Sequence, residues 1–283
     1  MINPLVNLAS LWKSIQQIVL SAQRLEEIFQ APAESAPQQD NKIIHQITGE
    51  IILNNVCFHY LSSSYYALQE FTLTIEAGEM IGILGSSGSG KSTLTKLIQG
   101  LYLPTSGQIL IDNYDLTSNS QVIRKFIGSV PQESFLFSRT VAENIAIGKP
   151  EASLQEIQKA AKMAGIHEFI ELLPLKYDSV IEERGINLSG GQRQRIAIAR
   201  SLILNPRILI FDEANSALDY ESEQIIYNNM KQISENRTVI IVSHRIEAFK
   251  DANRVIVLSG GRLIKEYEDM SLFFAEQSFK YDK

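Results

Sequence analysis

Cysteine is nearly absent from this sequence, because Cys57 is the only one among 283 residues. A single cysteine excludes a disulfide within the chain and any cluster of cysteine metal ligands, and it suits a reducing compartment such as the cytoplasm. We expect Cys57 to be a small buried residue.

Long apolar runs and signal-peptide features are also missing. No window holds about eighteen consecutive apolar residues, so we expect no membrane span within this sequence. Asn3, Asn7 and Lys13 interrupt the first apolar stretch, which argues against a secretory signal.

Blocks of basic residues are absent as well, and the net charge is −6. Proteins that bind nucleic acid without sequence preference normally carry a basic stripe, so we expect no nucleic-acid partner. With 45% hydrophobic and 20% charged residues, the chain is long enough to bury a sizeable core, as one large or two modest domains.

A helical period occupies the N-terminal part of the chain. Apolar residues recur three and four positions apart, at Leu5, Leu8, Trp12, Ile15, Val19, Ala22, Leu25 and Phe29. We predict an amphipathic helix from Pro4 to Gln30, followed by the linker "APAESAPQQDN". The predicted boundaries are 1–33 for the helix, 34–46 for the linker and 47–283 for the main domain.

The main domain has the pattern of an α/β fold. "EIILNNVCFHY" and the alternating Phe71, Leu73 and Ile75 indicate small antiparallel strands. "RILIFDE" and "TVIIVSH" are continuous apolar runs, which are typical of a parallel sheet covered on both faces. Helical spacing over residues 151–180 indicates a helical insertion, and "SGG" at 259–261 indicates a hairpin.

The loop "GSSGSGKS" at 85–92 fits the pattern G-x-x-x-x-G-K-[ST] in full. The apolar run "MIGILG" precedes it, and the spacing of Leu94, Leu97, Ile98 and Leu101 predicts a helix after it, which is the context that a phosphate-binding loop requires. We expect Lys91 at the β and γ oxygens of a nucleotide and the Ser92 hydroxyl on Mg²⁺. The predicted binding residues are Gly85, Ser86, Ser87, Gly88, Ser89, Gly90, Lys91, Ser92 and Thr93.

Two carboxylates, Asp212 and Glu213, end the apolar run "ILIF". Asp212 is predicted to hold Mg²⁺ through water, and Glu213 to orient or deprotonate the attacking water. Two solvated acids at a strand end are the competing interpretation. His244 ends a second apolar run, where it could donate to the γ-phosphate, although a lone histidine after a strand carries little information by itself.

A second anion-binding pattern occurs in "LSGGQRQRIAIAR" at 188–200, where Ser189 and two glycines open a helix-like run. One nucleotide does not need two phosphate grips from the same subunit. The pattern therefore raises the question of which phosphate the second grip holds.

These motifs, in this order, resemble those of the ATP-binding cassette (ABC) ATPases. The Walker A loop is Gly85–Ser92, the signature is Leu188–Gln192, Walker B is "ILIFD" and the D-loop is "SALD" at 216–219. The resemblance covers residues 48 to 265. It implies a P-loop NTPase with a mainly parallel core sheet, a small antiparallel β subdomain and a helical subdomain at 134–200.

The resemblance also implies which phosphate the second anion-binding pattern, at 188–192, would bind. In this family two cassettes pack head to tail, so that each signature caps the ATP held by the other copy, with Ser189, Gly190, Gly191 and Gln192 contributing to the site of the partner. The expected ligands are ATP and Mg²⁺, and the expected partner is a second copy of the domain.

Further roles come from the resemblance alone. Tyr60 is at the position of the aromatic residue that stacks on adenine, although an aromatic there could simply be core. Gln132 in "SVPQE" matches the Q-loop glutamine, which reaches Mg²⁺ and the attacking water. His244 matches the switch histidine, and Asp219 would connect the two active sites of the dimer.

Other positions match the family less fully. Glu183 matches an acidic position of exporters, with a solvated pair with Arg184 as the alternative. Asn215 replaces the threonine usual after "DEA". The C-terminal tail lacks the Gly-x-His pattern common in exporters, so no role is transferred to it.

Two stretches of the sequence indicate the kind of cassette protein. The N-terminal helix resembles the stalk of a half-transporter exporter, which predicts a membrane domain, fused or separate, and a place at the cytoplasmic face of the membrane. "ILIFDEANSALDYESE" is similar to hemolysin-type exporters of type I secretion, whose cargo is protein or peptide. An exporter of lipids or small hydrophobic compounds is an alternative. A DNA-repair ATPase fits less well, because that type would insert a long coiled coil and residues 93–187 show no sustained heptads. A translation ATPase fits less well, because that type joins two cassettes in one chain and this sequence has a single set of motifs and an acidic balance.

Overall fold

The computed structural model describes residues 3–30, 44, 46–61, 63–213 and 220–281. The chain divides into two compact units, Met1–Asn41 and Lys42–Lys283. Each is described by itself.

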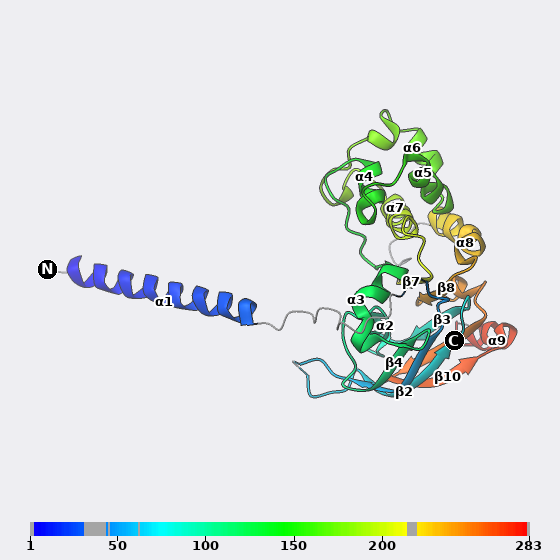
Figure 1. Cartoon of the computed structure of the whole chain (residues 1–283), viewed down its shortest axis with the longest axis horizontal. Coiled ribbons are helices and arrows are strands. Elements are labelled where there is room, and N and C mark those ends of the chain that lie inside the picture. The colour runs from blue at the N-terminus through cyan, green and yellow to red at the C-terminus, as the bar shows by residue number, and fades with distance from the viewer. Residues whose placement is uncertain (1–2, 31–43, 45, 62, 214–219, 282–283) are drawn as a thin grey trace. The chain divides into compact units, whose positions relative to one another are not determined.

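The described residues of the first unit form one helix, α1 (Asn3–Gln30), shown in blue in Figure 1. The helix predicted from Pro4 to Gln30 is therefore confirmed. Its apolar side chains are exposed along most of its length, at Leu11, Trp12, Ile15, Ile18, Val19, Leu20, Leu25 and Phe29. Among the helices in the described residues, none combines the length and apolarity needed to cross a membrane.

The second unit is built around a six-stranded sheet with the order β10-β9-β3-β8-β7-β6. Neighbouring strands from β9 to β6 are parallel, and β10 runs antiparallel to β9. The strands are β3 (Met80–Gly85), β6 (Ile127–Val130), β7 (Ile208–Asp212), β8 (Thr238–Val242), β9 (Arg254–Ser259) and β10 (Arg262–Tyr267). The predicted parallel strands and the predicted hairpin, whose turn is Gly260 and Gly261, are confirmed.

A smaller antiparallel sheet has the order β2-β1-β4-β5. Its strands are β1 (Ile51–Phe58), β2 (Leu68–Ile75), β4 (Ser106–Ile111) and β5 (Tyr114–Asp115). The alternating Phe71, Leu73 and Ile75 are buried, as their spacing predicts. This sheet and the helix α2 (Lys91–Ile98) share one core with one face of the large sheet.

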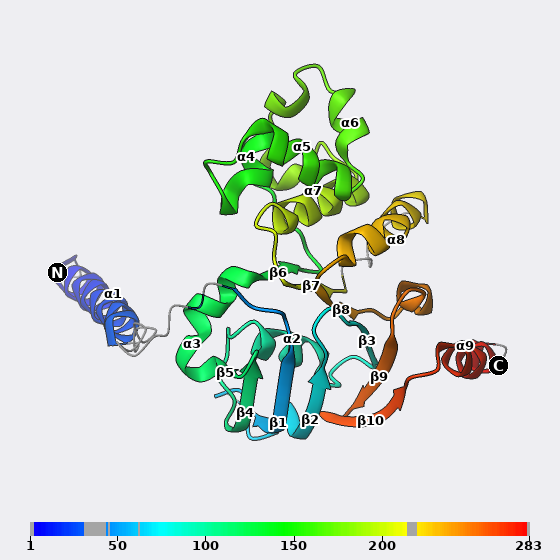
Figure 2. The ribbon, with the colours of Figure 1, turned by 45° about the vertical axis from the view of Figure 1, so that its right-hand side comes forward.

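The other face of the large sheet packs against a layer of helices (Figure 2). Because side chains alternate along a strand, Ile208 and Ile210 enter the core shared with α2, whereas Leu209 and Phe211 enter the core shared with the helices. The remaining α-helices are α3 (Leu116–Ile123), α4 (Val141–Ile145), α5 (Leu154–Met163), α6 (His167–Glu171), α7 (Gly190–Leu202), α8 (Tyr220–Ser234) and α9 (Met270–Tyr281).

Two expectations about single residues are wrong. Helix α2 ends at Ile98 because Gly100 adopts a φ of 65°, so Leu101 lies beyond the helix and is 54% exposed. Cys57 is half-buried rather than buried, since it lies in β1 on the opposite face from Val56 and Phe58, and its Sγ accepts the N–H of Glu70 at 3.2 Å.

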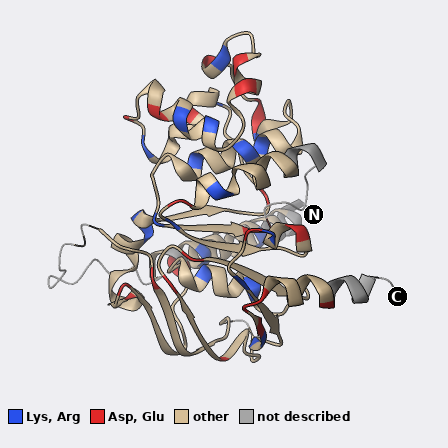
Figure 3. Cartoon of the chain, turned by 90° about the vertical axis from the view of Figure 1, so that its right-hand side faces the viewer, with Lys and Arg blue, Asp and Glu red and all other residues tan. Residues whose placement is uncertain are grey.

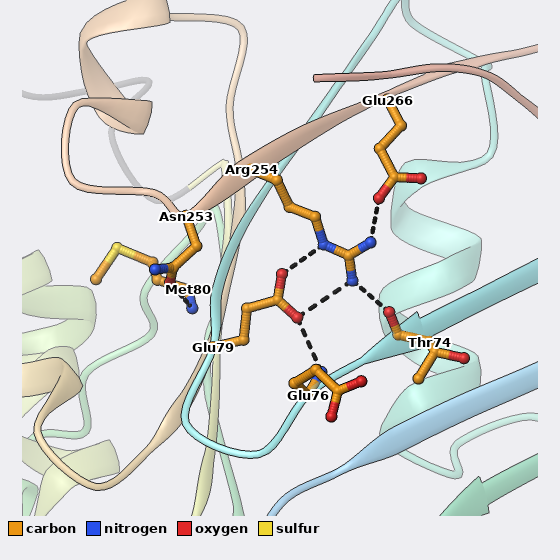
Figure 4. Close-up of polar contacts among 7 residues, drawn as sticks. All are labelled: Thr74, Glu76, Glu79, Met80, Asn253, Arg254 and Glu266. Atoms are coloured by element: carbon orange, nitrogen blue, oxygen red, sulfur yellow. Dashed lines mark hydrogen bonds and ion pairs between the residues drawn. The ribbon is translucent and has the colours of Figure 1, made fainter. Parts of the chain in front are cut away.

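The two sheets are joined by Arg254 at the start of β9 (Figure 4). Its guanidinium donates to both carboxylate oxygens of Glu79, to Glu266 of β10 and to the carbonyl of Thr74 in β2. Glu79 also accepts the N–H of Glu76 at 2.8 Å. One side chain therefore connects strands of both sheets at the amino end of β3.

Charged residues of both signs are interspersed over the layers of the second unit in the view of Figure 3. The basic residues form no continuous stripe along the described ribbon in that view. This distribution agrees with the small net charge of −6.

Candidate nucleotide site

The glycine loop between β3 and α2 takes a conformation that depends on its glycines. Gly88 and Gly90 have φ angles of 76° and 106°. A Cβ atom on Gly90 would lie 2.7 Å from the carbonyl oxygen of Ala67, and one on Gly85 would lie 2.6 Å from the carbonyl oxygen of Leu258. Larger residues at these two positions would therefore displace the backbone. The loop leads into the N-terminus of α2, where first-turn N–H groups have no acceptor within the helix and can bind an anion.

Lys91 turns back into this loop. Its Nζ donates to the carbonyl oxygens of Gly85 at 2.8 Å and Ser86 at 3.0 Å, and it lies 3.8 Å from Oε1 of Glu213. Burial lowers the pKa of Lys91, and the nearby charges of Glu213 and Asp212 oppose that change. The ammonium group is thus held inside the loop, where it can meet phosphate oxygens.

Asp212 ends β7 and faces α2. Its Oδ2 accepts a hydrogen bond from Oγ1 of Thr95 at 2.9 Å, whereas its Oδ1 is buried without a hydrogen-bond partner in the described residues. Burial raises the pKa of Asp212, and the neighbouring charge of Glu213 adds to the effect of burial, while the Thr95 hydrogen bond opposes it. Ser92 is exposed on α2, three residues before the Thr95 that bonds to Asp212. A buried carboxylate oxygen without a partner in the described residues, together with a hydroxyl on the same helix as Thr95, suits a hard cation such as Mg²⁺.

Glu213 points to a different partner from Asp212. Its φ is 50°, in the left-handed region, and its N–H donates to the carbonyl of Val242 at 2.9 Å. Its Oε1 lies 2.6 Å from Nε2 of His244, just beyond the end of β8. The turn at Glu213 therefore separates the two adjacent acids and pairs the second with the histidine.

The strand order brings these groups to one edge of the sheet. Lys91, His244 and Glu213 follow β3, β8 and β7, which are parallel neighbours. Gln132 follows the next parallel strand, β6, and is exposed. The carboxyl edge of a parallel sheet is where such folds bind ligands.

Tyr60 lies beyond the end of β1 and is half-buried. Its hydroxyl is 3.1 Å from Oγ1 of Thr93 on α2, and its ring meets Phe58 and Tyr102 edge-on, with centroids 4.9 and 5.3 Å away. The structure therefore places Tyr60 beside the phosphate loop.

The signature residues lie in the helical layer. Ser189 is the N-cap of α7: its Oγ accepts the N–H of Gln192 at 3.2 Å, and Oε1 of Gln192 accepts the N–H of Ser189 at 2.9 Å. Ser189 is exposed, Gly190 is half-buried and Gly191 is buried. Among the described residues, no hydrogen bond or ion pair joins 188–192 to the loop 85–93. The chain thus does not bring its two anion-binding patterns together by such contacts.

The remaining positions singled out in the sequence either lie outside the described residues or make no contact that would assign them a role. Asp219, the rest of "SALD" at 216–219 and Asn215 lie outside the described residues. Glu183 and Arg184 are both exposed in a short turn, and their side chains form no ion pair with each other in the described structure.

Sequence reasoning missed two contacts of this site. Thr95 is one turn after Lys91 on α2, a spacing that puts it on the same helix face and could have suggested its place beside Asp212. The approach of Tyr102 to Tyr60 had no sequence signal, because the residues are 42 positions apart on different elements.

Comparison with known proteins adds three findings. The family model described as "ABC transporter" matches residues 68–216. The chain is 49% identical over 261 residues to the alpha-hemolysin translocation ATP-binding protein HlyB of Escherichia coli O157:H7, and 47% identical over 266 residues to the toxin RTX-I translocation ATP-binding protein of Actinobacillus pleuropneumoniae. These matches cover 92% and 94% of this chain but only 37% of each relative.

A solved structure, titled as a bacterial Atm1-family ABC exporter with ATP bound, has a TM-score of 0.81 and 36% identity. The match covers 94% of this chain and 46% of that chain. The chain thus spans a little over a third of the length of the curated relatives and about half of the solved one.

Proposed function

Since this chain belongs to the ABC transporter family, we propose that it is the ATP-binding and ATP-hydrolysing part of an exporter whose cargo is a protein or peptide. The observation that carries the proposal is the Glu213–His244 pair at 2.6 Å, placed beside Lys91 and Asp212 at the carboxyl edge of the sheet. The names of the relatives support a protein cargo over a lipid, because they describe translocation of toxins.

Each residue of the site has a role in this proposal. Lys91 and the N–H groups of the loop bind the β and γ phosphates, and Tyr60 stacks on the adenine. Asp212, Ser92 and Gln132 would hold Mg²⁺, which neutralises phosphate charge when bound. Glu213 accepts a proton from the attacking water, whose oxygen bonds to the γ-phosphorus while the bond to the leaving ADP oxygen breaks.

His244 keeps Glu213 in place through the 2.6 Å contact and donates toward the γ-phosphate. The second phosphate grip acts in trans: Ser189, Gly190, Gly191 and Gln192 of one copy cap the ATP of another, and Asp219 links the two sites. Exposure of Ser189 supports this arrangement, because its side chain is accessible to a second copy.

The chain also takes a defined place in a larger assembly. We assign 1–33 to the stalk of a membrane domain, 34–46 to a linker and 47–283 to the ATPase, with 134–200 as its helical subdomain. The membrane domain, fused or separate, places the ATPase at the cytoplasmic face. A DNA-repair ATPase fits poorly, because the longest helix described between residues 93 and 187 is α5, with 10 residues, where that class would insert a long coiled coil.

The test is the solution mass of the Glu213→Gln variant, measured by light scattering with and without millimolar Mg-ATP. Removal of the proton acceptor should trap ATP, so we expect the mass to double only with the nucleotide. The matched control carries Ser189→Arg in addition, and should stay monomeric while it still binds ATP. A monomer under all conditions, despite demonstrated ATP binding, would contradict the trans role of the signature.

A further inference from the structure

The C-terminal helix α9 packs against the segment that carries His244, and we propose that α9 positions this histidine for ATP hydrolysis. The inference rests on the proposed function, because it concerns the same site. The connection consists of two phenyl rings, Phe273 of α9 and Phe249 of the 3₁₀ turn η5 (Ile246–Phe249).

The Phe249 side chain is fully buried and packs between β3 and α9. A Cβ atom on Gly82 of β3 would lie 2.5 Å from Cδ1 of Phe249, so the ring rests on the strand backbone where only glycine leaves room. On its other side the ring meets Phe273 edge-on, with centroids 5.9 Å apart and planes at 74°. Phe273 is fully buried as well. Phe249 is therefore confined from both sides.

Helix α9 is itself held on β10. The ring of Phe273 lies 5.3 Å from that of Tyr267, and the Tyr267 hydroxyl donates to Oε2 of Glu276 at 2.6 Å. Lys265 Nζ donates to the same carboxylate at 2.7 Å. Because Phe273 and Glu276 are three residues apart on one helix face, the two contacts fix α9 against β10 and keep Phe273 on Phe249.

His244 depends on this support because little packs around its ring. Its side chain is 50% exposed, and its short described contact is the one with Glu213. The backbone before it ends β8, where the Val242 carbonyl accepts the N–H of Glu213 at 2.9 Å. The Oγ of Ser243 accepts the N–H of Arg245 at 3.0 Å across His244, and the chain that follows is held by the buried Phe249. The orientation of a half-exposed side chain depends on the backbone that carries it. The packing of Phe249 therefore fixes the position at which the His244 ring contacts Glu213.

The consequence for hydrolysis follows from geometry. A shift of about 1 Å in a reacting group can lower a rate by about a hundredfold. No hydrogen bond, ion pair or ring contact joins α9 to the phosphate loop, which binds ATP, in the described residues. Loosening α9 should therefore lower kcat and leave KM for ATP nearly unchanged. A role in stability alone would not separate these two constants.

The experiment measures ATP hydrolysis by Phe273→Ala, Phe273→Leu and a matched control, Leu73→Ala. Leu73 is buried in β2, and its truncation removes apolar packing from the core that contains neither Phe249 nor Phe273. We expect Phe273→Ala to lower kcat about tenfold with KM within about twofold, and Phe273→Leu to recover most of the rate. Hydrogen exchange should speed up at the amides of 245–250 in Phe273→Ala and stay unchanged there in Leu73→Ala.

Equal losses of kcat in Phe273→Ala and Leu73→Ala, or a rise of KM in step with the fall of kcat, would overturn the positioning role. If Phe273→Ala does not fold, Glu276→Ala decides, because it loosens α9 at the surface: an unchanged kcat in that variant would also overturn the role. A wild-type chain without ATPase activity would overturn the proposed function itself, which separates the two failures.

Discussion

Asp212 and Glu213 are neighbours in sequence but serve different partners. Asp212 faces Thr95 on α2, and Glu213 faces His244 beyond β8. The left-handed φ of 50° at Glu213 produces this separation, and such a conformation is costly for a residue with a side chain. Strain at the residue proposed to accept a proton is consistent with a constraint from function rather than from folding.

Replacing Asp212 with Asn should stabilise the fold at pH 7 and abolish ATP hydrolysis. Burial raises the pKa of Asp212 above its ordinary value of 3.8, so the folded state favours the protonated form. The free energy of unfolding therefore falls as the pH rises from about 4 through the raised pKa, and the neutral amide avoids this loss. Melts between pH 4 and 8 should show that the variant gains in stability over wild type as the pH rises, and is the more stable of the two at pH 7. A variant less stable than wild type at pH 7 would refute this explanation.

Changes at Tyr60 should separate its ring from its hydroxyl. Tyr60→Phe loses only the contact with Thr93, so KM for ATP should stay within about twofold. Tyr60→Ala removes the stacking surface, which is worth ~1–3 kcal/mol per base, so KM should rise at least about fivefold. Steady-state kinetics with ATP and with tripolyphosphate check the assignment, because a stacking residue should not affect the substrate that lacks a base.

At the scale of elements, helix α7 is tied to α4 through Asn144. The Asn144 side chain is fully buried, accepts the N–H of Phe137 at 2.9 Å and donates to the Phe137 carbonyl at 2.9 Å. Arg200 of α7 donates to the Asn144 side chain and carbonyl, each at 2.9 Å. These bonds hold the signature helix within its layer.

Asn144→Ala should destabilise the helical layer by about 2–4 kcal/mol, because it removes the acceptor of the Phe137 N–H and of one N–H of Arg200 and leaves a cavity at a fully buried position. Asn119→Ala is the control, since Asn119 is half-buried on α3 and makes one hydrogen bond to its own turn. Urea denaturation should show a change below about 1 kcal/mol for the control. Similar losses in both variants would mean that the Asn144 bonds do not carry the connection.

The elements with strong local patterns were predictable and the others were not. The strands β3, β7 and β8 are continuous apolar runs, and α1 has a regular helical period, so their existence followed from the sequence. The end of α2 was missed because a single backbone angle at Gly100 decides it. Helix α9 was not predicted, because its apolar residues Leu272, Phe273 and Phe274 are adjacent rather than spaced on one face, and only Phe273 is fully buried.

The residues of the site also differ in how far the sequence could predict them. Residues that belong to contiguous motifs, such as Lys91 and Glu213, could be placed after apolar runs from the sequence. That they meet at one edge of the sheet follows from the strand order in the structure. The turn at Glu213 and the edge-on contact between Tyr60 and Tyr102 depend on backbone angles and on long-range packing, which no spacing in the sequence encodes.

At the scale of the whole second unit, Arg254 connects the two sheets (Figure 4). Its side chain is 17% exposed and that of Glu79 is 10% exposed, so this ion pair is largely shielded from water. Hydrogen bonds to the guanidinium raise the pKa of Arg254 against the effect of burial. The group stays charged and unites strands distant in sequence.

Arg254→Met should destabilise the unit by about 3 kcal/mol, because it leaves the carboxylate of Glu79 shielded and unpaired. Adding Glu79→Gln should recover part of the loss, since the unpaired charge is then removed. Arg262→Met is the control: its pair with Glu70 is exposed and should contribute less than about 1 kcal/mol. Thermal unfolding of the four proteins tests this, and no recovery in the double variant would contradict the role of the charge.

Under the proposed role in trans, the cap at Ser189 leaves part of the first turn of α7 open to a phosphate from a second copy. In the single chain, Ser189 and Gln192 satisfy each other's N–H groups. The N–H groups of Gly190 and Gly191, in the same turn, have no acceptor within the helix. A phosphate would bind these groups at the positive end of α7 without breaking the cap. When the phosphate leaves with the product, each copy keeps a capped helix that is stable alone, so separation of the copies does not require α7 to refold.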